Sequence, residues 1–463
     1  MAKDFIVAIE LGSSKMTGIA GRKNPDGSIS ILAVAKEDSA SYIRKGVAYN
    51  IERTAQGLSN IVSKLKNTLK TEIEQVYVGI GGQSIHSVKN SIVKELPLDC
   101  IVSQDMVNEL MDTNRSMEYK DCEILDAITQ EYNVDGHYED DPVGIQARHL
   151  EGNFLNVLWR RSFYRNLNKS LDNSGIKVAE MYLAPLTMAD CVLTDAEKRA
   201  GCVLVDLGAD TTTVSVYYRN KLRHIAVLPL GGSNVTKDLE SLQIDEINAE
   251  AMKLKHASAL TDEKDIDADA TLPIGDGRTI PSRMFIQVVE ARMLEIVENV
   301  KYLVPHEFAD KLLGGIVLTG GGSNMKNVEK LFHEVFDVEK VRIAKSTTLN
   351  INKKDSDVIL SEDGTTNTIL GLLAKGDMNC AGRAISGSLF DEEVEPDSEN
   401  TVTLDPTLAT TGTGTQPAAQ TTANAEEEEE EKAPEPHKPT KFSRFFGSLK
   451  KFGSSIFEPD VNE

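Results

Sequence analysis

The sequence predicts an α/β fold with mixed sheets, followed by a tail of different character. Apolar runs of strand length alternate with segments of helical periodicity over residues 5–380. Three of the expected strands end in short turns that contain glycine. Of the 463 residues, 40% are hydrophobic and 26% are charged, so the chain can bury a real core, and about three domains are expected. Collagen-like, small disulfide-rich and wholly disordered classes are excluded.

The first 83 residues predict a meander of strands, then a helix, then a further strand. The Asn-Pro-Asp-Gly sequence at 24–27 is typical of a turn between two strands. Apolar side chains at helical spacing predict a helix over residues 51–69. The expected strands are 5–11, 16–21, 28–35 and 76–80, and the last is closed by Gly81 and Gly82.

Residues 84–158 differ from what precedes them, with strand-like pieces, little glycine and one helix near 103–117. We interpret this segment as an inserted subdomain. After it, a helix is expected over 162–174, and strands over 178–183, 201–206, 211–217 and 222–228. Helices then dominate residues 232–255 and 282–304, and a strand at 316–319 precedes a helix over 324–336.

Charge and cysteine content exclude several functions. The net charge is −22, and phosphate backbones attract Lys and Arg, so no nucleic-acid partner is expected. The five cysteines are scattered and never in CxxC spacing, which favours a reducing compartment over a disulfide framework or a zinc site. No signal peptide and no membrane-spanning apolar stretch is evident, so we expect an intracellular protein that does not span a membrane.

Two segments, Ala8–Gly21 and Val203–Tyr217, share an acid at the end of a strand and a glycine two residues later. Ser or Thr then leads into the next strand. Such a hairpin turn can cradle phosphate oxygens with its backbone N–H groups, because glycine permits close approach. The acids, Glu10 and Asp206, would face a Mg²⁺ ion through water, and Lys15 would add a positive charge. Taken alone, a glycine-containing hairpin turn of this kind is more often a simple turn.

A third segment, Gly315–Met325, places Gly320–Gly322 after a strand. A flat ring could lie against this bare backbone, although a plain connection between strand and helix explains the glycines as well. The chain contains no GxxxxGK[ST] sequence, which excludes P-loop nucleotide hydrolases.

In order and spacing the three segments resemble the phosphate-1, phosphate-2 and adenosine motifs of the actin-type ATPase superfamily. The finer resemblance is to the bacterial cell-division FtsA family, and it covers residues 4–380. It rests on Leu222–Leu260, Ile286–Val300, Ala127–Phe154 and Thr366–Gly376. The resemblance implies an actin-like fold with two lobes and an inserted subdomain, with ATP and Mg²⁺ bound between the lobes.

The resemblance also implies the site residues. Glu10 and Asp206 would be catalytic and bind the metal, and Asp190 would orient water. The implied nucleotide-binding residues are Gly12, Ser13, Ser14, Lys15, Gly208, Ala209, Asp210, Thr211, Gly231, Gly232, Glu250, Lys253, Gly320, Gly321, Gly322 and Met325. Glu250 and Lys253 lie at i, i+3 and could instead be a solvated ion pair.

Two positions depart from the family pattern. Glu10 stands where the superfamily usually has Asp, and its extra methylene changes the metal geometry, so hydrolysis is expected to be slow at most. Ala209 and Asp210 stand where two glycines are more usual, and Asp210 adds a negative charge near the phosphates.

Following the family, four subdomains are expected in the body of the chain. Subdomain 1A would comprise residues 1–83, 161–200 and 360–385, and 1C residues 84–160. Subdomain 2A would comprise residues 201–230 and 306–359, and 2B residues 231–305.

The chain beyond the body has two contrasting parts. From Asp391 to Pro436 there are 14 acids and one base, and residues 391–437 have too few large apolar side chains to order, so a disordered acidic linker is expected. The pattern of residues 438–457 predicts an amphipathic helix, in which the apolar side chains cover an arc of about 140° around the helix axis. A basic amphipathic helix on a tether is typical of a membrane-surface anchor. The membrane-binding residues would be Lys441, Phe442, Arg444, Phe445, Phe446, Leu449, Lys450, Lys451, Phe452, Ile456 and Phe457.

That helix could instead pack on the protein itself or bind another protein. Taken with the resemblance, the anchor implies an ATP-binding adaptor that tethers FtsZ filaments to the cytoplasmic face of the inner membrane at the division site. The implied partners are the FtsZ C-terminal tail, further copies of the chain in a polymer, membrane lipids and other division proteins. The alternatives are a pilus-assembly ATP-binding adaptor, a small-molecule kinase of the same fold, and a chaperone.

Overall fold

The computed structural model describes residues 4–267, 269–275, 277–352 and 360–384. The chain divides into two units, residues 1–391 and 392–463, and every described element belongs to the first. The predicted linker at 391–437 and the predicted helix at 438–457 lie outside the described residues. Within the described part of the chain, no helix has the length and apolar character needed to cross a membrane.

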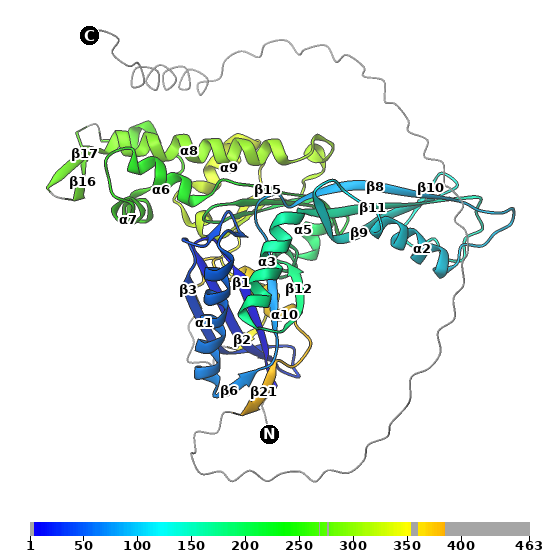
Figure 1. Ribbon diagram of the computed structural model, residues 1–463. Coiled ribbons are helices and arrows are strands. Elements are labelled where there is room, and N and C mark those ends of the chain that lie inside the picture. The colour runs from blue at the N-terminus through cyan, green and yellow to red at the C-terminus, as the bar shows by residue number, and fades with distance from the viewer. Residues whose placement is uncertain (1–3, 268, 276, 353–359, 385–463) are drawn as a thin grey trace, which may run out of the picture. The chain divides into compact units, whose positions relative to one another are not determined.

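The first sheet has six strands in the order β12-β7-β1-β2-β3-β20. Strands β1, β2 and β3 form an antiparallel meander, and β7 runs parallel to β1. Figure 1 shows the meander mainly in dark blue. The strands are β1 (Ile6–Leu11), β2 (Lys15–Lys23), β3 (Ile29–Asp38), β7 (Val76–Ile80), β12 (Val178–Leu183) and β20 (Ile351–Asn352).

The second sheet has nine strands in the order β10-β9-β11-β8-β15-β14-β13-β18-β19. Its first four strands come from the segment that the sequence marks as an insert, and they extend from the β15 edge (Figure 1). The strands are β8 (His86–Glu95), β9 (Cys122–Val134), β10 (His137–Glu139), β11 (His149–Arg160), β13 (Cys202–Leu207), β14 (Thr212–Tyr218), β15 (Lys221–Leu228), β18 (Gly315–Thr319) and β19 (Val341–Ile343).

Five strands of each sheet repeat one topology. The order β12-β7-β1-β2-β3 matches β19-β18-β13-β14-β15, with an antiparallel meander and two further parallel strands in each. The register repeats too, because Leu11 pairs with Met16 and Leu207 pairs with Thr212 across the first turn of each meander. The two acid-glycine turns therefore occupy equivalent places in the two halves.

Helices pack on these sheets by their apolar faces. Helix α1 begins after Asn50, whose side chain accepts a hydrogen bond from the Arg53 N–H, and it buries Leu58, Ile61 and Leu65 against the first sheet. The other helices are α2 (Gln104–Arg115), α3 (Arg161–Ser174), α4 (Ala184–Val192), α5 (Asp195–Ala200), α6 (Gly232–Glu240), α7 (Glu246–His256), α8 (Ser282–Leu303), α9 (Val328–Phe336) and α10 (Asn367–Lys375), with α1 at Ile51–Leu69.

Three small two-stranded sheets and three short 3₁₀ helices complete the described elements. The sheets are β4 (Ile43–Arg44) with β5 (Val47–Ala48), β6 (Thr71–Ile73) with β21 (Ala381–Ala384), and β16 (Thr271–Gly275) with β17 (Arg278–Pro281). We call the first sheet with α1, α3, α4, α10 and the β4–β5 hairpin the first lobe. Strands β13–β15, β18 and β19 with α6–α9 are the second lobe.

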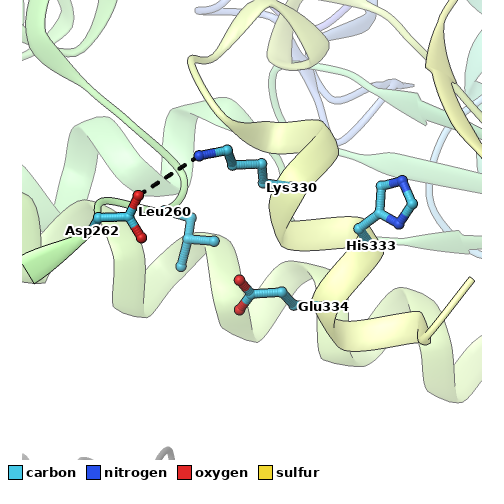
Figure 2. A pocket seen from close by; sticks show the side chains of 5 residues that line it. All are labelled: Leu260, Asp262, Lys330, His333 and Glu334. Carbon is cyan, nitrogen blue, oxygen red and sulfur yellow. Dashed lines mark ion pairs between the residues drawn. The ribbon is translucent and has the colours of Figure 1, made fainter. Parts of the chain in front are cut away.

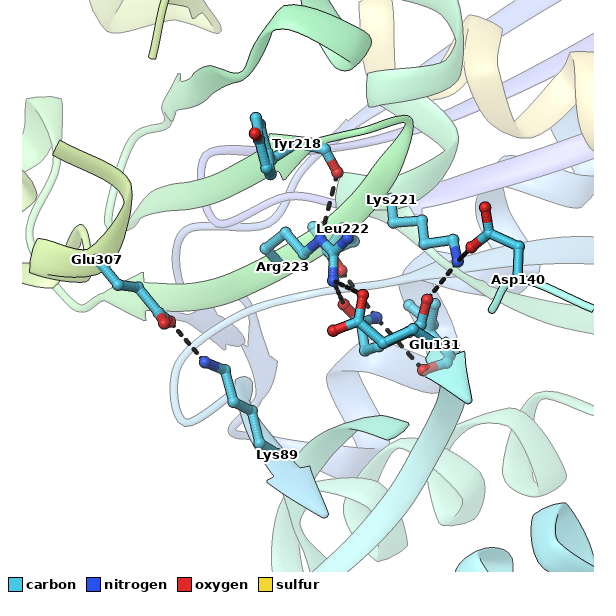
Figure 3. A network of polar contacts seen from close by, with 10 residues as sticks. Lys89, Glu131, Asp140, Tyr218, Lys221, Leu222, Arg223 and Glu307 are labelled. Carbon is cyan, nitrogen blue, oxygen red and sulfur yellow. Dashed lines mark hydrogen bonds and ion pairs between the residues drawn. The ribbon is translucent and has the colours of Figure 1, made fainter. Parts of the chain in front are cut away.

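The insert has its own small core, and both apolar packing of β11 and polar contacts join it to the rest of the chain. Strands β8 and β15 share one pair, His86 with Ala226. Figure 3 shows the side-chain contacts beside it. Arg223 Nη1 donates to Gln130 Oε1 at 3.1 Å, and Lys89 pairs with Glu307 at 2.5 Å. The insert thus follows the first lobe in the chain but pairs with β15.

Arg223→Met should weaken this junction far more than Lys89→Met. The Arg223 side chain is 11% exposed and the Lys89 side chain 65%. Removing the guanidinium takes away the hydrogen bonds that it donates to Gln130 Oε1 and to the Tyr218 carbonyl, which should cost about 2 kcal/mol of unfolding free energy. Loss of the exposed pair should cost no more than about 0.5 kcal/mol. Urea unfolding followed by fluorescence of Trp159, the chain's single tryptophan, measures both, and equal costs would contradict the prediction.

The predicted helices and strands agree with the structure except at one place. The predicted helix over 324–336 is wrong at its start, because α9 begins only at Val328. Residues Gly321–Asn324 form a 3₁₀ helix, and Asn327 has φ of 61°. A residue in the left-handed region cannot continue an α-helix. The 3₁₀ helix and the left-handed residue Asn327 therefore separate β18 from α9.

Candidate functional site

A cavity of about 780 Å³ lies between the two lobes and is lined by residues of both. The carboxyl ends of β1, β7, β13 and β18 supply the turns around it. Of the residues predicted from the sequence, the structure brings together Glu10, Gly12, Ser13, Ser14, Lys15, Asp206, Gly208, Ala209, Thr211, Gly231, Gly232, Glu250, Lys253, Gly320, Gly321, Gly322 and Met325.

The two acid-glycine turns have the same construction. A Cβ atom on Gly12 would lie 2.6 Å from the Lys15 carbonyl oxygen, and one on Gly208 would lie 2.8 Å from the Thr211 carbonyl oxygen. The Gly208 N–H donates to that Thr211 oxygen at 2.9 Å. Both turns therefore need glycine and present bare backbone to the cavity, which is what close approach of an anion requires.

Glu10 and Asp206 line the cavity from opposite lobes. Burial, together with the nearby Asp206 carboxylate, raises the pKa of Glu10 to about 8, against the opposing effects of Lys15 and Thr368. Burial raises the pKa of Asp206 to about 6. Two carboxylates that are costly to ionise together favour a divalent cation between them, because the cation compensates both charges.

The space beside Asp206 is kept open by Gly320. This residue has φ of 80°, and a Cβ atom on it would lie 2.3 Å from Asp206 Oδ1. Within the described residues, no group of three or more His, Cys, Asp and Glu side chains is placed to hold a metal. A Mg²⁺ ion at the Glu10–Asp206 pair would therefore take its remaining oxygen ligands from water and phosphate, as this ion commonly does.

The wall formed by α6 and α7 carries the Glu250–Lys253 pair. Lys253 Nζ donates to Glu250 Oε2 at 2.7 Å, to Thr236 Oγ1 at 3.0 Å and to the Gly232 carbonyl at 3.1 Å. The Lys253 side chain is only 11% exposed. A Cβ atom on Gly231 would lie 2.5 Å from the Ala209 carbonyl oxygen, so α6 begins directly against the second turn. The pair belongs to the cavity wall and is not a solvated pair on an exposed helix.

Two predicted site residues do not line the cavity. Asp190 lies on α4 and is engaged by two ion pairs, with Lys198 Nζ at 2.8 Å and Lys375 Nζ at 2.7 Å. The structure thus places Asp190 in ion pairs and not among the residues that line the cavity. The Asp210 carboxylate accepts a hydrogen bond from the Lys45 N–H at 3.0 Å. Neither residue is among those that line the cavity.

Sequence reasoning missed part of the lining. The missed residues in the first lobe and the adjoining loop are Leu11, Thr17, Gly46, Gly79, Gly81, Gly82, Ala184, Pro185, Gly364, Thr365 and Thr368. Gly81 and Gly82 follow a strand just as Gly320–Gly322 do, so the same pattern could have identified them. Thr368 lies on α10 and reaches Glu10 only through the tertiary fold, and no local signal marks it.

A second, smaller hollow of about 280 Å³ lies in the second lobe between α9 and the loop after α7 (Figure 2). It is lined by Leu260, Asp262, Lys330, His333 and Glu334, and Lys330 pairs with Asp262 at 3.8 Å. None of the glycine turns contributes to it. The larger cavity is therefore the candidate site.

Comparisons with known proteins agree with this architecture. The family model described as "Cell division protein FtsA" matches residues 203–361, and the model of the SHS2 domain inserted in FtsA matches residues 82–158. The cell division protein FtsA of Porphyromonas gingivalis is 32% identical over 354 residues, which are 74% of each chain. That of Neisseria meningitidis is 29% identical over 72% of this chain and 82% of its own. That of Escherichia coli K12 is 27% identical over 74% and 84%.

Among solved structures, a chain of a PilM–PilN type IV pilus biogenesis complex superimposes with a TM-score of 0.54. It is 14% identical and covers 80% of this chain and 97% of its own, a likeness of fold alone. The actin-like α/β fold with an inserted subdomain, predicted from the sequence, is confirmed. With two domain models and relatives aligned over most of its body, this chain belongs to the FtsA family of bacterial cell division proteins.

Proposed function

We propose that this chain binds ATP and Mg²⁺ in the cleft between its lobes and uses the nucleotide as a structural switch in a cell-division adaptor. The observation that carries the proposal is the meeting of the two acid-glycine turns at one cavity. These turns occupy equivalent hairpins of a repeated topology. A polyphosphate between them would contact backbone N–H groups of both lobes and so favour the closed form.

Each part of the cleft has a proposed task. The turns that begin at Gly12 and Gly208, with Lys15, would hold the phosphates. Glu10 and Asp206 would hold the metal, which when bound neutralises charge between phosphates and carboxylates. Glu250, Lys253 and Met325 would contact the nucleoside, together with the glycines that follow β18. We propose hydrolysis that is slow at most, because Glu10 is longer than the usual Asp and Asp190 lies outside the cleft.

The partners follow from family membership and the sequence pattern of the tail. We propose that residues 231–305 bind the C-terminal tail of FtsZ, and that residues 84–160 and lobe contacts mediate self-polymerisation. Other division proteins would join the assembly. Residues 441–457 would attach the protein to the cytoplasmic face of the inner membrane at the division site, with the acidic segment before them as a spacer. We also propose that subdomains 1A, 1C, 2A and 2B have the boundaries predicted from the sequence.

Vesicle flotation tests the adaptor. The full chain and a chain ending at Ala433 are mixed with anionic vesicles, with and without FtsZ filaments and Mg·ATP. Only the full chain should float, and FtsZ should float only with it, because the apolar rings enter the acyl boundary and each basic residue adds about 1 kcal/mol at an anionic surface.

Two full-length variants separate the contributions to membrane binding. Phe445→Ser with Phe446→Ser removes apolar burial, and Lys450→Glu with Lys451→Glu reverses charge. The double serine variant should not float with any vesicles. The double glutamate variant should lose flotation with anionic vesicles specifically. If the chain ending at Ala433 floats as well as the full chain, the tail is not the anchor. If FtsZ stays in solution while the full chain floats with the vesicles, the proposed adaptor function is wrong.

A further inference from the structure

The β4–β5 hairpin of the first lobe has a two-residue tip, Lys45–Gly46. Arg44 pairs with Val47, and the tip residues have φ of 50° and 73°, the left-handed conformation of a tight hairpin turn. Ile43 and Val47 are buried in the large apolar cluster that contains the first sheet and α1, and β5 packs on α3. The hairpin is therefore packed on the first lobe.

Backbone contacts fix the tip to the first lobe. The Lys45 carbonyl accepts a hydrogen bond from the Gln83 N–H at 2.8 Å. A Cβ atom on Gly46 would lie 2.4 Å from Gly82 Cα, so the two glycine backbones are in direct contact. Nothing larger than glycine fits at this crossing, so the tip is held against the segment that follows β7.

Both turns of the cleft reach this tip with a side chain. The Gly46 N–H donates to Ser13 Oγ of the first turn at 2.8 Å, and the Lys45 N–H donates to Asp210 Oδ2 of the second turn at 3.0 Å. Two successive N–H groups thus hold one side chain from each lobe. The distance between the two acid-glycine turns is therefore set by the neighbouring N–H groups of Lys45 and Gly46.

We propose that Asp210 is a positioning residue that latches the second lobe to the hairpin tip and so sets the fraction of closed, nucleotide-competent protein. Its neighbours Gly208, Ala209 and Thr211 line the cavity, whereas Asp210 does not. The carboxylate serves as the acceptor of a charge-assisted hydrogen bond to the other lobe. This inference rests on the proposed nucleotide binding and adds how the cleft is held closed.

Loss of the latch should appear as faster opening. The apparent affinity of a ligand falls with the fraction of protein in the competent form. Asp210→Ala removes the acceptor, so release of a fluorescent ATP analogue should accelerate on the order of tenfold. Asp210→Asn keeps a carbonyl acceptor without the charge, and release should accelerate by no more than about threefold.

Hydrogen exchange tests the latch without any nucleotide. In Asp210→Ala the peptide containing residues 43–48 should exchange faster in the free protein, and Asp210→Asn should restore most of the protection. Asp141→Ala is the matched control, because Asp141 Oδ1 accepts the Val143 N–H at 3.1 Å within the insert. It should change neither readout.

The outcomes separate the latch from the proposed function. Unchanged exchange over residues 43–48 in Asp210→Ala overturns the latch. Tighter ATP binding in both Asp210 variants also overturns it, because the residue would then act by repelling phosphates. If the unaltered protein binds no ATP, the proposed function fails, and the exchange experiment still decides whether Asp210 holds the lobes together.

Discussion

Gly320→Ala should lower the affinity for ATP by at least about 100-fold, because it displaces Asp206, the carboxylate that we propose holds the metal. The added Cβ atom would lie 2.3 Å from Asp206 Oδ1 and 2.7 Å from the Leu207 carbonyl oxygen. The second of these is backbone and cannot rotate away, so the end of β13 must shift. Titration of a fluorescent ATP analogue in the presence of Mg²⁺ measures the loss.

Two glycine variants separate this contact from backbone strain. Gly27 has φ of 79°, nearly the same as Gly320, but a Cβ atom on it meets nothing within 4 Å. Gly27→Ala should cost about 1 kcal/mol of unfolding free energy and leave ATP affinity unchanged. Gly321 lines the same cavity, and its Cβ atom would be 3.6 Å from Thr365 Cγ2, so Gly321→Ala should leave the free energy of unfolding nearly unchanged. If Gly320→Ala leaves ATP affinity unchanged, as Gly27→Ala should, the tight fit beside Asp206 has no role in binding.

Local patterns were enough to predict most of the fold. The helix over 51–69 was predicted at its observed bounds, because apolar side chains recur there at helical spacing. The strands on either side of Gly12 and Gly208 were predicted for a similar reason, since apolar segments of strand length flank a turn that needs glycine. These signals lie within about 20 residues of chain and depend on nothing distant.

Contacts between distant residues set the limit of sequence reasoning. Asp210 was predicted to face the phosphates, yet its partner is the N–H of Lys45 in the other lobe. Asp190 was predicted to orient water, but its carboxylate forms ion pairs with Lys198 and Lys375. The Glu250–Lys253 pair was implied as a nucleotide contact by the family resemblance, but its spacing also fitted a solvated ion pair. Only the hydrogen bonds to Thr236 and Gly232 show that it forms the cavity wall.

Metal-free protein should lose stability between about pH 4.5 and pH 8, and Glu10→Gln should remove most of that loss. Burial and the Asp206 carboxylate raise the pKa of Glu10 from 4.5 to about 8 in the folded state. A carboxyl whose pKa is raised on folding stabilises the protein below its unfolded pKa, and this stability is lost as the pH rises through the folded pKa. The neutral amide of Gln does not titrate and keeps the shape.

The expected difference is on the order of 3 kcal/mol, since one pKa unit corresponds to 1.36 kcal/mol and Glu10 keeps some contact with water in the cleft. In EDTA, Glu10→Gln should therefore unfold at higher urea than the unaltered protein at pH 8, with the gap closing toward pH 5.

Asp190→Asn is a control of opposite sign. Burial raises the pKa of Asp190, but hydrogen bonds from Lys198 and Lys375 outweigh this effect and hold it below its usual value. Asp190→Asn should thus be less stable than the unaltered protein by a constant amount over pH 5–8. A Glu10→Gln curve parallel to that of the unaltered protein would show that the two carboxylates do not oppose each other in the cleft.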